Sequence, residues 1–564
     1  MAKMTGGQAL AKSLYREGVR IIFGLPGVQT YHAMDALAQE PGIQFITTRH
    51  EQAATYMADG FARAGGTPGI ALVVPGPGLQ NASAGLGTAY AASSPVFLIS
   101  GQIPIDKIGK DVGVLHEVND QLDTIKPITK WQARVLNPTD IPAAVHEGFR
   151  NLKTGRPRPV EIEIPPETLA EEAEVELYES EEYPRLLGDN NTIKRALELL
   201  SEAKNPVIWA GGGVNSSGAS EEIQGLAELL QAGVITTAEG KGSISDRHPL
   251  SLGVPRRTPD ALSEHFQECD VVVAVGTRFA EAPIIESQRI IQVDVDPAEL
   301  GRNHPNTLGV LGDAKSVLQQ IIQALSNDSY QASSKKEFFE DIREQRQTQA
   351  KKTQPQGEFI RAIREVMPDD GILISGMTQV GYYSRWAYPV FEPRTYLTSS
   401  YYGNLGYAYP TALGAKVAQP DRAVVAVSGD GGFLFNSQEL ATAAMYGINA
   451  VVIVFNDNAF GNVYRDQTNR FEGRVIGSQL KNPDFVKLAE AYGCVGIRAK
   501  TPDELDDKII EMINTDRPVI FDCMVDKEEN CFPMIPSGKP HNQMLLGPKD
   551  QKETKISKKG KTLV

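Results

Sequence analysis

Short apolar runs that end in Gly or Pro alternate with amphipathic stretches along most of this 564-residue chain. The runs are short enough for buried strands, and the stretches between them are long enough for helices. This alternation is typical of βαβ units, so it predicts an α/β fold in which parallel sheets are covered by helices. The clearest strand candidates are residues 21–23, 70–74, 96–99, 159–164, 207–210, 271–275, 423–427 and 451–455.

Two polar segments divide the chain. Residues 165–184 carry eight glutamates and are interpreted as a solvated acidic connector, and residues 326–356 are polar and mixed in charge, with a possible helix start at 338–342. At one domain per roughly 150 residues, the length agrees with three buried cores. We therefore expect three consecutive α/β domains followed by a lysine-rich tail, with the ranges 1–165, 185–325, 357–540 and 541–564.

Composition excludes several classes of protein. The formal net charge of -14 argues against a partner held by its phosphate backbone, so no nucleic acid is expected. No apolar run approaches the ~20 residues of a membrane span, and the start of the chain lacks a secretory apolar segment. Four cysteines without paired spacing or a histidine cluster predict neither a zinc site nor a disulfide framework. A cytoplasmic protein without a membrane segment is expected.

Two polar motifs follow neighbouring strand candidates. Gly429-Asp430-Gly431-Gly432 ends one run, and Asn456-Asp457-Asn458 ends the next one 24 residues later. A right-handed crossover places both motifs at the carboxyl edge of adjacent parallel strands. Each motif alone would be a tight turn or a loop cap. Together they offer two carboxylates to a divalent cation and glycine backbone to a diphosphate, which predicts a Mg²⁺–diphosphate site.

This pair of motifs resembles the signature of thiamine diphosphate (ThDP) enzymes, and residues 4–540 are similar to the acetolactate synthase branch of that family. The resemblance implies pyrimidine-binding, central and diphosphate-binding domains, in that order. It implies that the metal is held by Asp430, Asp457 and the backbone carbonyl of Ala459, with Asp457 in place of the usual Asn. The cofactor-binding set implied by the same comparison is Gln379, Asp430, Gly431, Gly432, Asn458 and Gly461.

Residues 49–54 and 58–63, RHEQAA and ADGFAR, resemble the family stretch whose glutamate contacts N1′ of the cofactor aminopyrimidine. The matching residue is Glu51. A carboxyl group at N1′ favours the imine that takes the proton from C2 of the thiazolium. The alternative is that Glu51 is a carboxylate serving only the start of a helix.

Three more residues carry weaker resemblances. In the segment 402–406, Gly403 and Leu405 match the family residues that accept a hydrogen bond from the cofactor amine and wedge its two rings into a V shape. The alternative for Leu405 is core packing. Gly27 lies in a GLPG loop similar to the one near the thiazolium, and His116 is a candidate proton shuttle or a loop histidine without a catalytic part.

The middle of the chain contains glycine-rich and acidic turns at 211–213, 276–279 and 294–297. They resemble segments that bind FAD in acetolactate synthases, and ADP or nothing in other branches. Glycines alone are weak evidence for a nucleotide. FAD and ADP are therefore both candidate ligands of the central domain.

The segments that hold the second substrate differ from the family pattern at 280–283, 377–381 and 462–466, where the last lacks the family Trp. The primary hypothesis is a ThDP- and Mg²⁺-dependent decarboxylation or carboligation of a 2-oxo acid such as pyruvate. The alternative is a C–C lyase of the 2-hydroxyacyl-CoA lyase or benzaldehyde lyase type. A non-catalytic paralogue would be expected to lack Glu51 or Asp430. The resemblance also implies a homodimer or homotetramer with the active site between subunits.

Overall fold

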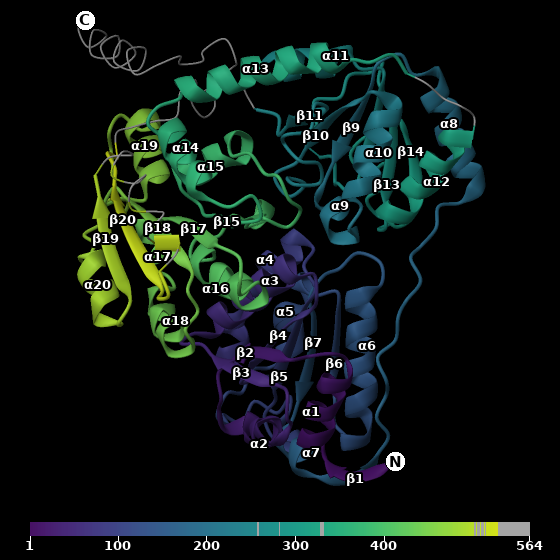
Figure 1. Ribbon diagram of the computed structural model, residues 1–564. Helices are drawn as coiled ribbons and strands as arrows, with labels where there is room; N and C mark the ends of the chain where they lie inside the picture. Colours follow the sequence, from purple (N-terminus) through teal and green to yellow (C-terminus); the bar gives the residue numbers. More distant parts are fainter. Residues whose placement is uncertain are drawn as a thin grey trace, which may run out of the picture.

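The computed structural model describes residues 1–256, 259–280, 282–327, 332–500, 504, 508, 512–513 and 515–527 (Figure 1). Three six-stranded sheets form its framework, and every strand pair within them is parallel. A separate antiparallel ribbon joins β1 (Ala2–Thr5) to β8 (Glu172–Val175). The predicted fold class, three parallel-sheet α/β domains, is confirmed. The eight strand candidates all lie on strands of the structure.

The N-terminal sheet has the strand order β3-β2-β4-β5-β7-β6. Its apolar strands are buried on both faces, as expected for a parallel sheet between two helical layers. Its strands are β2 (Ile21–Gly24), β3 (Gln44–Thr47), β4 (Gly69–Val73), β5 (Val96–Gly101), β6 (Trp131–Arg134) and β7 (Val160–Ile164). Its helices are α1 (Gly6–Arg16), α2 (Tyr31–Gln39), α3 (Glu51–Gly65), α4 (Pro77–Ala92), α5 (Gln121–Ile125), α6 (Ile141–Lys153) and α7 (Pro166–Ala170).

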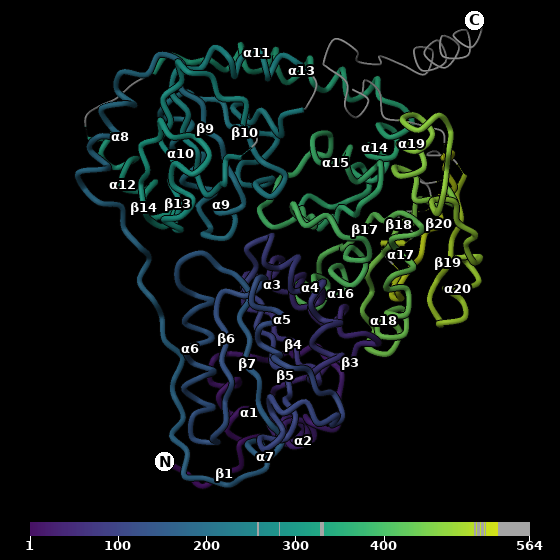
Figure 2. Tube along the Cα trace, turned by 180° about the vertical axis from the view of Figure 1, so that it is seen from behind, coloured from purple at the N-terminus to yellow at the C-terminus, as the bar shows by residue number. Residues whose placement is uncertain are grey.

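The central sheet has the order β11-β10-β9-β12-β13-β14 and encloses a core of its own. An extended segment, 176–189, connects it to the N-terminal domain along the outside of the molecule (Figures 1 and 2). Its strands are β9 (Pro206–Ala210), β10 (Gly233–Thr236), β11 (Ser251–Gly253), β12 (Val271–Val275), β13 (Arg289–Asp294) and β14 (Thr307–Leu311). Its helices are α8 (Asn190–Glu202), α9 (Gly212–Ser217), α10 (Ser220–Leu230), α11 (Ala261–Glu268) and α12 (Ala314–Asn327).

The C-terminal sheet has the order β16-β15-β17-β18-β20-β19. The order reverses around β15 and β17, and this is the kind of edge at which α/β proteins bind ligands. Its strands are β15 (Ile372–Ser375), β16 (Tyr396–Thr398), β17 (Val424–Gly429), β18 (Val451–Asn456), β19 (Val495–Ala499) and β20 (Val519–Met524). Its helices are α14 (Gln356–Val366), α15 (Gln379–Ala387), α16 (Ala408–Ala418), α17 (Asp430–Phe433), α18 (Leu440–Tyr446), α19 (Gly461–Arg470) and α20 (Phe485–Ala491).

The N-terminal and C-terminal domains share one hydrophobic core, in which α3 packs directly on α16. Glycines bring the two helices together. A Cβ on Gly60 would lie 2.0 Å from the carbonyl oxygen of Thr411, and a Cβ on Gly414 would lie 1.9 Å from the carbonyl oxygen of Met57. Because each glycine faces the backbone of the other helix, no side chain fits at either position. The two helices therefore pack backbone against backbone across the boundary between the domains.

Both polar segments that divide the sequence contain regular structure. The acidic segment 165–184 contributes α7 and β8, so it is a solvated connector only in its second half. The segment 326–356 contains the predicted helix, α13 (Lys336–Lys352), whose Phe339 and Ile342 pack into the central core. The lysine-rich tail at 541–564 lies outside the described residues.

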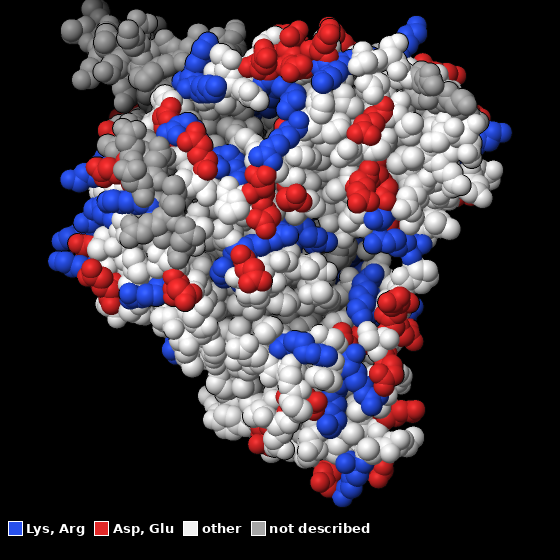
Figure 3. All heavy atoms as spheres, in the orientation of Figure 1, with Lys and Arg blue, Asp and Glu red and all other residues white. Residues whose placement is uncertain are grey.

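Two global features of the described part of the chain bear on its partners. None of its helices combines the length and the apolar character that crossing a membrane requires. On the face drawn in Figure 3, basic and acidic side chains are interspersed over all three domains.

Candidate active site

A cavity of about 300 Å³ opens at the carboxyl edge of the C-terminal sheet. Its walls come from the loops that follow β15, β16, β17 and β18, which are widely separated in sequence and adjacent in the sheet. Eight residues predicted to bind the cofactor or its metal line it: Gln379, Leu405, Asp430, Gly431, Gly432, Asp457, Ala459 and Gly461. The structure therefore brings the two halves of the predicted metal site together.

Asp430 is the first residue of α17, directly after β17, and it is almost fully buried. Its Oδ1 accepts a 2.8 Å hydrogen bond from the backbone N–H of Gly431, and its Oδ2 accepts a 2.6 Å hydrogen bond from Asn482. Burial raises the pKa of Asp430, and these two hydrogen bonds oppose that shift. The carboxylate is thus oriented from both sides before any cation is present.

Asp457 follows β18, and its Oδ1 accepts a 3.1 Å hydrogen bond from the N–H of Ala459. Burial raises the pKa of Asp457 to about 6, and the negative charge of Asp430 adds to the shift. Arg465, on the helix that follows, opposes it. A buried carboxylate whose proton affinity is raised by a second carboxylate beside it is suited to share a divalent cation with that neighbour.

Glycines keep the space around these carboxylates open. A Cβ on Gly461 would lie 2.3 Å from Oδ2 of Asp457, and a Cβ on Gly431 would lie 2.4 Å from the ring of Phe460. Asn458, which lies in the same loop but outside the cavity wall, has a positive φ of 52°. The loop is fixed by a 2.8 Å hydrogen bond from the N–H of Leu480 to the carbonyl of Asn458.

The donor set fits a hard divalent cation that holds a diphosphate. It consists of the carboxylates of Asp430 and Asp457 and the backbone oxygen of Ala459, all of which are oxygen ligands. The buried Oδ1 of Asn482 has no hydrogen-bond partner among the described residues, which is what a site expecting a further group shows. Asn482 was not found from the sequence because it follows no strand candidate and belongs to a loop.

Leu405 forms part of the cavity wall beside the glycine turn, and its Cδ2 would lie 3.7 Å from a Cβ on Gly432. The neighbouring Gly403 has a φ of +64° and is not among the residues that line the cavity. An apolar side chain directly above a diphosphate turn is in a position to support a ligand that bends over it. This placement agrees with a wedge and does not require Leu405 to serve in the core.

Glu51 lies in a second group, at the carboxyl edge of the N-terminal sheet. It is the first residue of α3, and its Oε2 accepts a 3.0 Å hydrogen bond from Asn81 of α4. A carboxylate at a helix N-terminus is favoured by the helix dipole, so both interpretations of Glu51 agree with its position. The hydrogen bond from Asn81 also orients the Glu51 carboxylate, which a role in helix capping alone would not require.

Gly27 and His116 lie at the same edge of the N-terminal sheet. A Cβ on Gly27 would lie 2.2 Å from Cγ1 of Val74, so the loop rests on the residue that follows β4. Nδ1 of His116 lies 3.0 Å from Oε1 of Gln29, and His116 has a φ of +70°. The described residues that line the C-terminal cavity do not include Gly27, Glu51 or His116. Within one chain the predicted site residues therefore form two groups.

In the central domain the predicted glycines have a packing role. A Cβ on Gly211 would lie 2.3 Å from the carbonyl oxygen of Gly276, and a Cβ on Gly213 would lie 2.6 Å from its Cα. The turn after β9 thus packs against the end of β12. Burial raises the pKa of Asp294, which ends β13, to about 6. The glycines are accounted for without a ligand.

Comparison with known proteins identifies the family. Three family models match in order: "Thiamine pyrophosphate enzyme, N-terminal TPP binding domain" at residues 4–124, the central domain of the same enzymes at 193–321, and their "C-terminal TPP binding domain" at 379–523. The last two ranges contain the central turns and most of the residues that line the cavity, respectively.

Curated relatives match over nearly the whole chain. A probable acetolactate synthase large subunit of Methanocaldococcus jannaschii is 39% identical and covers 95% of this chain and 94% of its own length. The acetolactate synthase large subunit of Haemophilus influenzae is 34% identical, with 98% of this chain and 100% of that protein covered. The acetolactate synthase isozyme 3 large subunit of Escherichia coli is 32% identical, with 97% and 99% covered. With three domain matches in sequence order and relatives of this extent, the chain belongs to the thiamine pyrophosphate enzymes and, among them, to the acetolactate synthase-like branch.

Proposed function

We propose that this protein is a ThDP- and Mg²⁺-dependent enzyme that decarboxylates a 2-oxo acid such as pyruvate and joins the remaining fragment to an acceptor, as acetolactate synthases do. One observation carries the proposal: Asp430, Asp457 and Leu405 meet in a single cavity at the carboxyl edge of the C-terminal sheet. The names of the relatives support the substrate class.

Different residues of the cavity would bind the metal and the diphosphate. Asp430, Asp457 and the carbonyl of Ala459 would hold Mg²⁺, and Gly431 and Gly432 leave room for the diphosphate to approach the backbone. When bound, ThDP would supply a nucleophilic carbon and an electron sink for decarboxylation of the 2-oxo acid. Leu405, in the cavity wall, would support the cofactor's rings from one side.

Glu51 would hold a proton at N1′ of the aminopyrimidine and so promote loss of the C2 proton. His116, 3.0 Å from Gln29, is proposed to exchange protons with the substrate. Gly27 would let its loop pass close to the thiazolium. These assignments require the edge of an N-terminal sheet to face the cavity.

A second copy of the chain would supply that edge. Exposed apolar side chains accompany both groups of site residues, as is typical of surfaces that become buried on association. Val28 (53% exposed) follows Gly27, Leu115 (62%) precedes His116, and Val463 (52%) lines the cavity. We propose a homodimer, or a homotetramer made of such dimers, in which Glu51 of one chain serves the cavity of the other.

FAD or ADP remains a candidate ligand of the central domain, and a visible absorbance spectrum of the purified protein decides for or against the flavin. Three described cysteines are free buried thiols, which agrees with a reducing compartment, and we propose the cytoplasm. The domain limits 1–165, 185–325 and 357–540 are likewise proposals.

The alternative activity is a C–C lyase acting on a 2-hydroxyacyl compound. Asn462, Val463 and Arg465 line the cavity in the segment that differs from acetolactate synthases. This change affects the acceptor side and leaves the cofactor residues in place. The two activities would use the same cofactor site and would differ in the substrate that this site accepts.

The test is an assay of the purified protein with Mg²⁺, ThDP and pyruvate, with identification of the products. CO₂ release with acetolactate formation supports the proposal. Untouched pyruvate together with cleavage of a 2-hydroxyacyl compound supports the lyase. Asp430→Ala is the matched control and should remove either activity together with Mg²⁺-dependent cofactor retention. A wild-type protein that binds no ThDP would overturn both.

A further inference from the structure

The segment that carries Leu405 is anchored by other domains. It runs from β16 (Tyr396–Thr398) to Gly406, and glycines with positive φ stand on both sides of the pair Asn404–Leu405, at Gly403 (+64°) and Gly406 (+86°). Glycines of this kind permit many backbone conformations. The position of Leu405 therefore depends on whatever holds Asn404.

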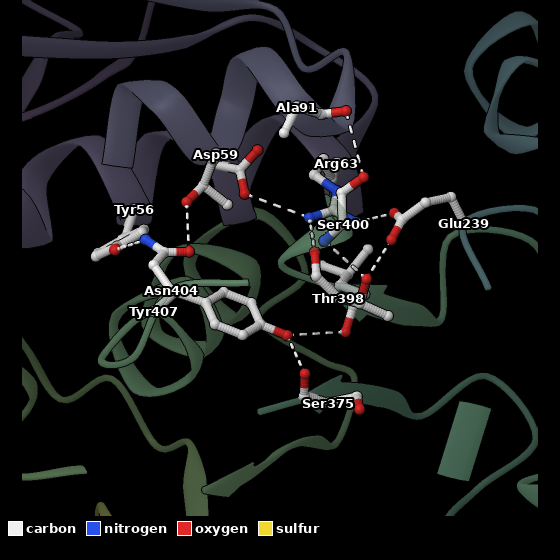
Figure 4. Close-up of polar contacts among 12 residues, drawn as sticks. Tyr56, Asp59, Arg63, Ala91, Glu239, Ser375, Thr398, Ser400, Asn404 and Tyr407 are labelled. Atoms are coloured by element: carbon white, nitrogen blue, oxygen red, sulfur yellow. Dashed lines mark hydrogen bonds and ion pairs between the residues drawn. The ribbon is translucent and has the colours of Figure 1, made fainter. Parts of the chain in front are cut away.

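Asn404 reaches into the N-terminal domain (Figure 4). Its Oδ1 accepts a 2.9 Å hydrogen bond from Oγ1 of Thr88 on α4, and its Nδ2 donates a hydrogen bond to the phenol oxygen of Tyr56 on α3. Tyr56 and Thr88 are completely buried. Both ends of the amide are thus used by side chains of another domain, whereas the next residue, Leu405, lines the cavity.

A second anchor holds the start of the same segment. The guanidinium of Arg63 on α3 donates a 2.7 Å hydrogen bond to the carbonyl of Thr398 and pairs with Glu239 of the central domain at 2.6 Å. The hydroxyl of Thr398 also donates to Glu239. Figure 4 shows Arg63, Thr398 and Glu239 each in contact with the other two, so all three domains meet at this point.

We propose that Asn404 is a positioning residue, which Tyr56 and Thr88 hold so that Leu405 stands at the height at which it bends the bound cofactor. The inference rests on the proposed function. Asn404, Tyr56 and Thr88 do not line the cavity, so they act through Leu405 and not by contact with the cofactor. Because the gap between the aminopyrimidine and C2 is sensitive to small shifts, a loosened Leu405 slows proton loss more than it weakens binding.

Cofactor binding and C2 proton exchange depend on different residues in this arrangement. A general structural defect would instead impair both. Binding strength comes mainly from Asp430, Asp457 and the diphosphate turn, none of which contacts Asn404. The bent geometry depends on Leu405. Loss of either hydrogen bond to Asn404 should therefore lower the rate of C2 proton exchange and leave the ThDP dissociation constant nearly unchanged.

The test uses the full-length holoenzyme and two variants that remove one hydroxyl each with little change of shape, Tyr56→Phe and Thr88→Val. The control is Ser83→Ala on α4, whose hydroxyl bonds only locally, to the carbonyl of Gln80 at 2.7 Å. Three quantities are measured: the ThDP dissociation constant, the rate of hydrogen–deuterium exchange at C2 of the bound cofactor, and the amide exchange of the peptide containing residues 400–407 in the protein without cofactor.

We expect C2 exchange to fall by about tenfold in both variants, with faster amide exchange in 400–407 and a dissociation constant within about twofold of wild type. Ser83→Ala should match wild type in all three quantities. Adding Asn404→Ala to the double variant Tyr56→Phe/Thr88→Val should cause little further loss, because both hydroxyl partners of Asn404 are already removed. Wild-type C2 exchange in both variants would overturn the inference, as would a parallel loss of binding and exchange. A wild-type protein that binds no ThDP would instead overturn the proposed function.

Discussion

Nδ2 of Asn482 donates a 2.6 Å hydrogen bond to Oδ2 of Asp430, and it also lies 3.0 Å from Oδ1 of Asn456. Asn482 comes from the loop that follows α19, far from either of the motifs that predicted the metal site. One amide thus connects the ends of β17 and β18. The orientation of the Asp430 carboxylate depends on this side chain.

Asn482→Ala is therefore expected to weaken divalent-cation binding by about tenfold or more, as loss of a hydrogen bond to a metal ligand commonly does. Titration with Mn²⁺ in the presence of ThDP, followed by electron paramagnetic resonance, measures the affinity. The exposed neighbour Lys481 provides the control, since Lys481→Ala should leave it unchanged. Equal affinities for wild type and Asn482→Ala would exclude a supporting role for this amide.

Glu51→Gln tests the proposed activator. The substitution keeps a side chain that can interact with Asn81 but removes the carboxylate, so C2 proton exchange should slow by about a hundredfold or more while ThDP remains bound. Exchange is followed by quenching in deuterated buffer and analysis of the cofactor. Glu174→Gln, at an exposed glutamate of the ribbon strand β8, is the matched control. A Glu51→Gln variant that exchanges like wild type would limit this residue to helix capping.

Gly461→Ala tests how closely the turn after β18 approaches Asp457. The added Cβ would lie 2.3 Å from Oδ2 of Asp457, so the carboxylate must move and cation binding should weaken by about tenfold. Isothermal titration with Mg²⁺ and ThDP measures the loss. Gly225→Ala is the control: it lies within α10 and its Cβ would meet only a side-chain atom at 3.7 Å, so binding should be retained. Unchanged binding in both variants would show that the turn relaxes.

Glu439 gives the protein a pH-dependent stability. It is completely buried and accepts hydrogen bonds from Thr442 (2.6 Å) and from the N–H of Arg49 (3.1 Å). Burial raises the pKa of Glu439 to about 7, above its unfolded value of about 4.3. The folded state therefore binds this proton more tightly, so the contribution of Glu439 to stability is greatest below about pH 4 and declines as the pH rises toward 7.

Glu439→Gln removes that dependence. Denaturant unfolding of the cofactor-free protein between pH 5 and 8 should show the stability of the variant rising relative to wild type as the pH increases. Glu174→Gln serves here too, since an exposed carboxylate should leave the pH profile parallel to wild type. A constant difference between Glu439→Gln and wild type across this range would contradict the raised pKa.

The sequence predicted those elements whose cause lies in a short stretch of residues, such as an apolar run or a motif at the end of a strand. Apolar runs such as 271–275 became buried strands because a β-branched run between turns has few other ways to bury its side chains. Asp430 and Asp457 were found because the ends of adjacent strands must meet. The ribbon strand β8 was missed: its alternating glutamates appear solvated until β1, far away in the sequence, pairs with them.

The residues that sequence reasoning missed act across the tertiary structure. Asn482 and Glu439 lie in loops or short turns, and their roles arise from contacts with Asp430 and Arg49 that no local pattern encodes. Asn404 was inside a recognised motif, yet its own partners are on two helices of another domain. Glu51 was identified from its motif. Only the fold shows that, within one chain, Glu51 does not line the cavity.

The contact of α3 with α16 has a consequence for synthesis of the chain. Gly60 is made about 350 residues before Gly414, which at about 5–20 residues per second corresponds to a delay of roughly 20–70 s. During that interval the face of α3 that will enter the shared core has no partner from the C-terminal domain. The nascent N-terminal domain thus emerges from the ribosome with an apolar surface open, and chaperones that bind such surfaces have their longest access to this protein before its last third is translated.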